Sequence, residues 1–136
     1  MAVDGGFGLV FKVDVAATPT TVPNVKDSSF PETEHVLDDI TAHDSTGGYE
    51  EFIATGLIRT GEFEVDVVWD IAEATHAELQ SIWAAGTSTP MSLATPASAE
   101  TLSFSGLVKT IQRASPIDKA LTSKVKIKVN GAITFT

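Results

Sequence analysis

Residues 62–70, which read EFEVDVVWD, decide the fold class of this chain. Phenylalanine, valine and tryptophan at the odd positions alternate with acidic side chains at Glu62, Glu64 and Asp66. A period of two is typical of a strand that turns one face to a core and the other to water. The stretch therefore predicts a half-buried β-strand with an acidic row on its polar face.

Two stretches nearer the C-terminus repeat this alternation. Residues 101–108 place leucine, phenylalanine and valine on one face and Ser103 and Ser105 on the other. Residues 121–130 alternate in the same way, and their polar face carries a basic row. This row consists of Lys124, Lys126 and Lys128.

Other parts of the chain carry weaker signals. Shorter apolar runs predict further strands at residues 7–15, 33–41 and 91–94. The three prolines between residues 16 and 31 predict an irregular connection there, with at most an edge strand.

The period changes after Asp70. This residue is a good N-cap with a glutamate three residues later, and Gly86 is a suitable C-terminal stop. A stripe at helical spacing lies between them, which predicts a helix over about residues 71–84. The stripe consists of Ile71, Thr75, Leu79, Ile82 and Trp83. One helix among many strands makes the chain mainly β.

Length and composition limit the alternatives. The 136 residues, 43% of them hydrophobic and 20% charged, fit a single globular domain spanning residues 1–136. Residues 1–8 are glycine-rich and predict a flexible N-terminal arm. The absence of cysteine excludes disulfides and thiolate sites, and the three histidines lack metal-ligand spacing, so no metal or cofactor is expected. We see neither a membrane span nor a signal peptide.

The charge is strongly acidic and unevenly distributed. The formal net charge is −9, which argues against a protein that grips nucleic acid by its phosphates. Residues 1–78 carry 16 acidic and 3 basic side chains, whereas residues 79–136 carry 2 acidic and 6 basic ones. The acidic row and the lysine row could pair if their strands are neighbours, within one subunit or between copies; the sequence leaves this open.

A long polar connection, AHDSTGGYEEFIATG, spans residues 42–56. Unstructured loops of this length are uncommon in compact domains and tend to be functional. Tyr49, Phe52 and Ile53 are apolar groups on this loop, which indicates that it docks, either on a partner or on its own domain.

Catalytic interpretations have little support. His43, Asp44 and Ser45 are the residue types of a triad, but triads are assembled from separate segments, so a turn is the better interpretation. The carboxylates of the acidic row lie along one strand face rather than converging on a bond, which favours a solvated face. No enzymatic function is predicted.

Taken in order, these segments resemble the major tail tube proteins of long-tailed, non-contractile (siphovirus-type) phages and related phage-derived particles. The resemblance covers residues 31–135. It rests on TEHVLDDITAHDSTGGYEEFIATGLIRTGEFEVDVVWD, on the helix ending at Trp83, and on LSFSGLVKTIQRASPIDKALTSKVKIKVNGAITF. The S/T-GG-Y-x-E-F loop leads into the alternating strand, and S-P-x-D with N-G-x-x-x-F belongs to the last hairpin.

The resemblance implies a β-sandwich or barrel-like subunit with one flanking helix and a long projecting hairpin loop. Six subunits would close a ring by joining their inner sheets, and rings would stack head to tail into a tube. The lumen, electronegative in related tubes, would conduct DNA without specific binding. The implied partners are further copies of the chain, the tape measure, the tail terminator and the distal tail protein, with no membrane. The location would be the virion tail, after synthesis in the bacterial host cytoplasm.

The resemblance also implies roles for particular residues. The loop would reach the neighbouring ring, with contacts from Asp44, Ser45, Gly47, Gly48, Tyr49, Glu50, Glu51 and Phe52. The lumen would be lined by Asp38, Glu62, Glu64, Asp66, Ser103 and Ser105. Lys124, Lys126 and Lys128 would form a complementary basic face, and the unpaired acidic excess would lie toward the lumen. No C-terminal immunoglobulin-like domain is expected.

A free-standing β-sandwich that binds a ligand such as carbohydrate is the alternative. It would need an aromatic platform, and most of the seven Phe and two Trp fall at core positions. A hydrolase that uses His43 or the acidic row is a third reading.

Overall fold

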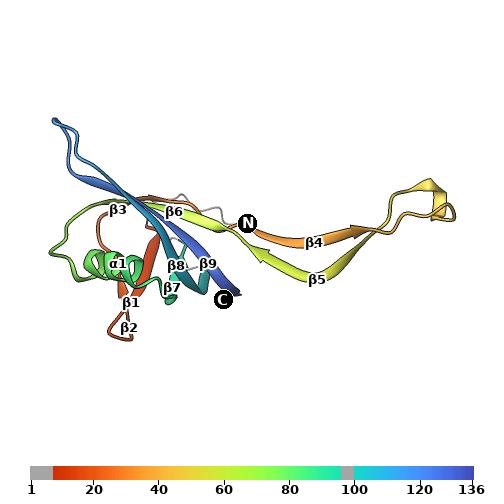
Figure 1. The fold of residues 1–136 in the computed structure, drawn as a ribbon, viewed down its shortest axis with the longest axis horizontal. Coiled ribbons are helices and arrows are strands. Elements are labelled where there is room, and N and C mark those ends of the chain that lie inside the picture. Colours follow the sequence, from red (N-terminus) through yellow and green to blue (C-terminus); the bar gives the residue numbers. More distant parts are fainter. Residues whose placement is uncertain (1–7, 96–99) are drawn as a thin grey trace.

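The computed structural model describes residues 8–95 and 100–136, so most of the expected N-terminal arm, residues 1–7, lies outside the described residues. The described chain forms a seven-stranded antiparallel sheet in the order β2-β1-β7-β8-β9-β6-β3 and a separate two-stranded ribbon, β4-β5 (Figure 1). The strands are β1 Val10–Val15, β2 Thr18–Thr21, β3 Val25–Ser28, β4 Thr33–Asp39, β5 Phe52–Thr60, β6 Glu62–Val68, β7 Thr89–Ala94, β8 Thr101–Ala114 and β9 Thr122–Phe135. The one α-helix of the described residues, α1, spans Ala74–Ala85, and a 3-10 turn, η1, spans Thr46–Gly48.

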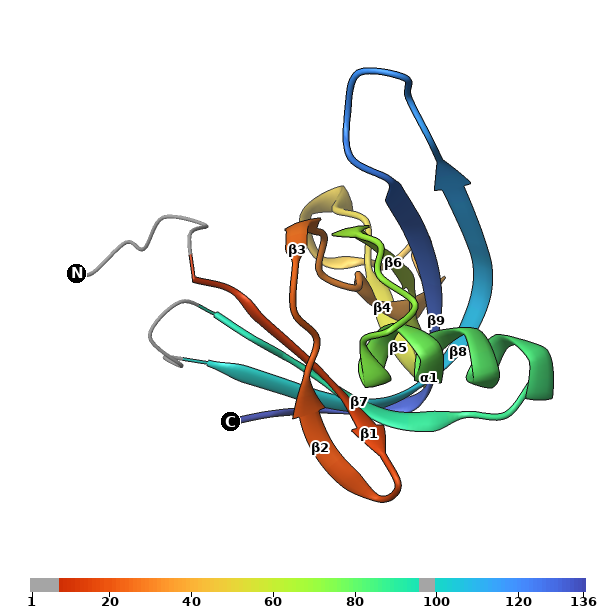
Figure 2. The same cartoon turned by 90° about the vertical axis from the view of Figure 1, so that its left-hand side faces the viewer.

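The large sheet curls around one hydrophobic core, which confirms the mainly β, barrel-like fold expected from the alternating strands (Figure 2). Phe63 of β6 lies at its centre. Its ring meets Phe11 of β1 and Phe104 of β8 edge to face, at centroid separations of 6.1 and 5.3 Å. Such pairs add about 0.5–1.5 kcal/mol each beyond the burial of their area. The alternation in β6, β8 and β9 therefore supplies the apolar face that the sheet closes upon.

Helix α1 packs against β1 and β8. It buries Thr75, His76, Leu79 and Ile82, and it ends as expected at Gly86, whose φ of 67° lies in the left-handed region. It begins later than expected: Glu73 is the N-cap residue, without a side-chain cap.

The start differs because the side chain of Asp70 is used by the turn before the helix. Its Oδ1 accepts the N–H of Ala72 at 3.0 Å, and its carbonyl accepts the N–H of Glu73. Two members of the predicted stripe also lie outside the core, since Ile71 is 55% and Trp83 53% exposed.

Two expectations for the irregular segments were wrong. Residues 16–31 contain two short strands, β2 and β3, one at each edge of the sheet, because edge positions tolerate prolines such as Pro19. The predicted loop of residues 42–56 is shorter, because β5 already begins at Phe52.

The β4-β5 ribbon projects far from the body, and we call residues 33–60 the arm (Figure 1). The hairpin of β8 and β9 projects from the opposite end. Among the described residues, no helix has the length and hydropathy needed to cross a membrane.

Candidate assembly surfaces

The acidic and lysine rows lie directly opposite each other on neighbouring strands of one subunit. In the antiparallel pairing of β6 with β9, Glu62 faces Lys128, Glu64 faces Lys126 and Asp66 faces Lys124. Opposite charges at such positions stabilise a sheet. The pairing that the sequence left open is therefore intramolecular. We call the side of the sheet that carries these rows the polar face.

Ion pairs connect the two rows. Glu64 bridges two lysines, with Oε1 3.4 Å from Nζ of Lys126 and Oε2 3.8 Å from Nζ of Lys124. Nζ of Lys128 donates instead to the carbonyl of Thr60. The paired side chains are 42–47% exposed, so each pair contributes less than about 1 kcal/mol. Their main effect is to neutralise charge on the polar face.

A further lysine, Lys109 of β8, joins this face although the sequence did not indicate it. Its Nζ lies 3.1 Å from Oε2 of Glu62, two strands away. Lys109 follows the core residue Val108, so the alternation of β8 turns it to the polar face. A β-bulge begins at this point, because β8 steps from Val108 to Thr110 while β9 steps by one residue. The signal in the sequence was the alternation of residues 101–108, which places residue 109 on the polar side.

The β3 edge continues the polar face. Asp27 of β3 pairs with Asp66, and a second bulge adds Lys26. Both line a groove of about 540 Å³ with Asp66 and Lys124. Counted across β3, β6, β9 and β8, the face carries four carboxylates and five lysines. They are Asp27, Glu62, Glu64 and Asp66 against Lys26, Lys109, Lys124, Lys126 and Lys128.

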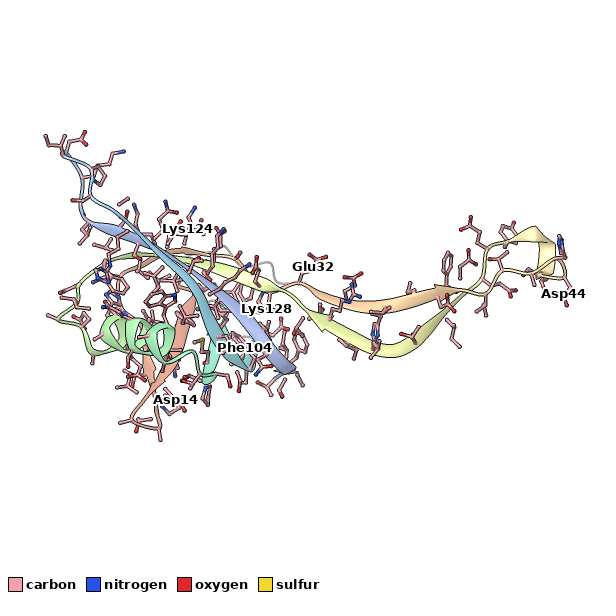
Figure 3. The ribbon with its side chains drawn as sticks, in the orientation of Figure 1. Asp14, Glu32, Asp44, Phe104, Lys124 and Lys128 are labelled. Atoms are coloured by element: carbon pink, nitrogen blue, oxygen red, sulfur yellow. The ribbon has the colours of Figure 1, made fainter. Side chains whose placement is uncertain are left out.

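The residues expected in the lumen do not all lie together. Ser105 pairs with Asn130 of β9, two positions from Lys128, so it shares the polar face with the charged rows. Ser103 lies two positions before it on the same side. Asp38, in contrast, belongs to β4 of the arm. Figure 3 shows Lys124 on the side of the sheet away from α1 and Asp44 at the far tip of the arm.

The arm combines negative charge with exposed apolar side chains. It has six acidic residues, Glu34, Asp38, Asp39, Asp44, Glu50 and Glu51, against one basic residue, Arg59, which gives −5 of the net −9. Seven large apolar side chains on it are 48–78% exposed. These are Leu37, Ile40, Tyr49, Phe52, Ile53, Leu57 and Ile58. A two-stranded ribbon is only marginally stable in water by itself, and exposed apolar patches of this kind are typical of contact surfaces.

Local hydrogen bonds shape the end of the arm. Glu51 donates its N–H to the hydroxyl of Thr41 at 2.8 Å, which holds the two strands together beyond their last pair. Thr41 also lowers the pKa of the exposed Asp39 carboxyl through hydrogen bonds from its hydroxyl and its backbone N–H. Gly47 and Gly48 have φ values of 67° and 73°, which favour glycine at the tip. All the residues expected in the inter-ring loop, from Asp44 to Phe52, lie in this distal part.

Two backbone edges beside the polar face are open in the described chain. β7 pairs with β8 only from Thr101 to Gly106, so the outer edge of β8 beyond Gly106 pairs with no strand in the described chain. β3 ends the sheet on the other side, with an open outer edge. Its extended course continues beyond Ser28, because Ser29 donates to the carbonyl of Glu64 and Gly61 to that of Glu32. Such edges are templates for strand addition.

The buried His76 is structural. Its Nδ1 accepts the N–H of Asp70 at 3.0 Å, and its Nε2 donates to the carbonyl of Pro23 at 3.0 Å. Trp69 stacks on its ring, and the guanidinium of Arg113 lies 4.9 Å from the centroid of the Trp69 ring. Within the described ranges, histidine and carboxylate side chains form no group suited to hold a metal ion.

The family model described as lambda phage tail tube protein matches residues 16–136. A search of the curated proteins by sequence finds no match.

Solved structures share the fold at low sequence identity. The tail of an empty gene transfer agent particle, refined with C6 symmetry, has a TM-score of 0.84 at 16% identity and covers 98% of this chain and 99% of that one. A chain of the anti-feeding prophage baseplate has a TM-score of 0.79 at 6% identity, with coverages of 100% and 97%. The SPP1 tail tube has a TM-score of 0.70 at 10% identity, with coverages of 95% and 75%. The family match spans most of the chain, which therefore belongs to the lambda phage tail tube protein family, structural and non-enzymatic components of the virion tail.

Proposed function

We propose that this chain closes into rings through its two open strand edges and that the rings stack through the arm into a tube whose lumen conducts DNA. The observation that carries the proposal is the pair of open edges on β3 and β8, at either side of a four-stranded segment whose outer surface is polar. Family membership sets aside the carbohydrate-binding module and the hydrolase.

The strand directions suit ring closure. The pairs β3-β6, β6-β9 and β9-β8 are all antiparallel, so β3 and β8 run in opposite directions. In a ring of rotated copies, β3 of one subunit would therefore meet β8 of the next as an antiparallel pair. Closure in this way removes both open edges, which is the physical advantage of a barrel. The C6 symmetry of the related gene transfer agent tail supports six copies per ring.

The same geometry orients the subunit. Helix α1, β1 and the core lie behind the four-stranded segment, on the side opposite the polar face. A closed ring of these segments would place the polar face inward and α1 outward. Glu62, Glu64, Asp66, Ser103 and Ser105 would then line the lumen, together with the lysine row. Asp38 would reach the lumen only if the distal part of the arm, where it pairs with Ile53, also borders it.

The arm supplies the stacking contact in this proposal. Its exposed apolar side chains and its charge of −5 favour docking on a second copy in the next ring. Such a head-to-tail contact between unlike surfaces, repeated from ring to ring, builds a filament. The contact would come from Asp44, Ser45, Gly47, Gly48, Tyr49, Glu50, Glu51 and Phe52. At the tube ends the same surfaces would meet other tail components, which we expect to be the tape measure, tail terminator and distal tail proteins.

Electron microscopy of the purified chain, or of the particle that contains it, tests the proposal. Hollow tubes with a regular ring repeat are expected. A species that stays monomeric at all concentrations, with no particle that contains it, would refute it.

A further inference from the structure

We propose that the polar face is a masked polyphosphate-binding surface, whose carboxylates Glu62, Glu64 and Asp66 keep its lysines from holding DNA. The inference rests on the proposed function, because it takes the polar face as the lumen wall. It goes further in what it assigns to the acidic row: these carboxylates would act by pairing with the neighbouring lysines, not by repelling DNA directly.

The first step is the charge of the face. Five lysines on β3, β6, β9 and β8 outnumber the four carboxylates by one. The face is thus close to neutral, although the whole chain carries −9. The acidic excess lies largely on the arm, whose net charge is −5. Repulsion by a strongly negative wall therefore does not explain how DNA would slide past this face.

The second step is the position of the lysines. Lys124 and Lys126 both lie within 4 Å of Glu64, and Lys109 lies 3.1 Å from Glu62. These lysines are 42–57% exposed, so a phosphate could reach each of them. A bound phosphate would have to displace the carboxylate already there. Lysines on adjacent strands would otherwise form a basic patch, the feature that gives proteins sequence-independent affinity for DNA.

The third step is repetition. Each ring would present one such face per subunit, and stacked rings would repeat it along the tube. Weak attraction at a single face would thus add over many faces and stop the DNA. Pairing of Lys109, Lys124 and Lys126 with carboxylates keeps this sum small at each face along the lumen.

The test compares two variants with the same net charge. The masking variant is Glu62→Gln/Glu64→Gln/Asp66→Asn, which removes the carboxylates from β6. The control is Asp14→Asn/Glu73→Gln/Glu78→Gln, which removes three carboxylates from β1 and the region of α1; Asp14 lies far from Lys124 and Lys128 (Figure 3). Both variants carry −6 in place of −9. Thermal unfolding establishes first that each is folded.

Binding of a fluorescent DNA duplex is measured first with unassembled subunits. At low salt the masking variant is expected to bind at least about tenfold more tightly than the control, with a log–log salt slope of about −0.9 for each phosphate contacted. The wild type and the control are expected to bind weakly and alike. Equal binding by the two variants would overturn the proposal.

The same duplex is then offered to assembled tubes. Tubes of the masking variant are expected to retain DNA that wild-type tubes release. If the masking variant binds DNA more tightly as subunits but not as tubes, the carboxylates do mask the lysines. The polar face would then not line the lumen. A wild type that forms no tubes would instead refute the proposed function, so the two failures are distinguishable.

Discussion

Lys109 reaches Glu62 across the whole width of β9, with 3.1 Å between Nζ and Oε2, and it does so from a β-bulge in β8. The bulge takes up one extra residue of β8, so that the side chains beyond it still alternate between the core and the polar face. Beyond it, Ile111 pairs with Val125 on the core side and Gln112 with Lys124 on the polar side. Strand β8 thus places a lysine beside Glu62 on the polar face and keeps Ile111 on the core side.

Insertion of one alanine between Lys109 and Thr110 is expected to destabilise the subunit by about 2 kcal/mol or more. The bulge absorbs one extra residue, so a second would turn every later side chain of β8 to the other face or shift its pairing with β9. The substitution Lys109→Ala keeps the bulge and removes only an exposed ion pair, so it should cost less than about 1 kcal/mol. Urea unfolding of both variants measures the difference. Equal losses of unfolding free energy in the two variants would show that the number of residues at the bulge does not decide which later side chains of β8 face the core.

Replacement of His76 tests the buried cluster behind the sheet. His76→Leu leaves the N–H of Asp70 and the carbonyl of Pro23 without their partner, at a cost of about 1–3 kcal/mol for each group left unsatisfied. The exposed His43 provides the matched control, and His43→Leu should change stability by less than about 0.5 kcal/mol. The free energy of unfolding distinguishes them. A His76→Leu variant as stable as the wild type would contradict the structural role.

Removal of the arm tip, residues 45–52, is expected to leave a folded subunit and abolish the stacking of rings. The reason is that the tip contributes nothing to the core, and Tyr49 is 78% exposed. Circular dichroism reports the fold, and electron microscopy reports the tubes. Leu57→Ser/Ile58→Ser is a finer test at two exposed positions of β5, with unchanged stability and shorter tubes expected. Tubes of normal length from the deletion variant would refute the assignment of the arm.

Hydrogen exchange locates the ring contact. The outward N–H groups of β3 and of β8 beyond Gly106 should exchange freely in the subunit and become protected in the tube, because neighbouring copies would bond them. Amides at the centre of the sheet, in β9, provide the internal reference. Unchanged exchange at both edges on assembly would exclude closure through β3 and β8.

The sequence predicted the parts of the fold in which local pattern and burial agree. β6, β8 and β9 alternate over long stretches, and all three were confirmed. β2 and β3 were missed because they are four residues each and lie beside prolines, in edge positions that only the whole sheet defines. The start of α1 was placed too early because a turn at Asp70 offers the same signal as a helix cap.

The candidate surfaces were predictable in composition but not in arrangement. The acidic and lysine rows were visible, yet their pairing joins residues some sixty positions apart, which no local pattern encodes. Lys109 was missed because the strand was predicted to end at Val108, whereas β8 continues to Ala114. The projecting loop was predicted from its length and from Tyr49 and Phe52, whereas the length of the arm depended on the pairing of β4 with β5. Docking of this loop on a partner stays a prediction.

A cryo-electron microscopy map of the assembled tube, at a resolution that traces strands, tests the assembly most directly. We expect β3 of each subunit to pair with β8 of its neighbour in the ring, the row of Glu62, Glu64 and Asp66 to face the lumen, and α1 to lie outside. A tube in which α1 lines the lumen, or in which β3 and β8 remain unpaired, would contradict this arrangement.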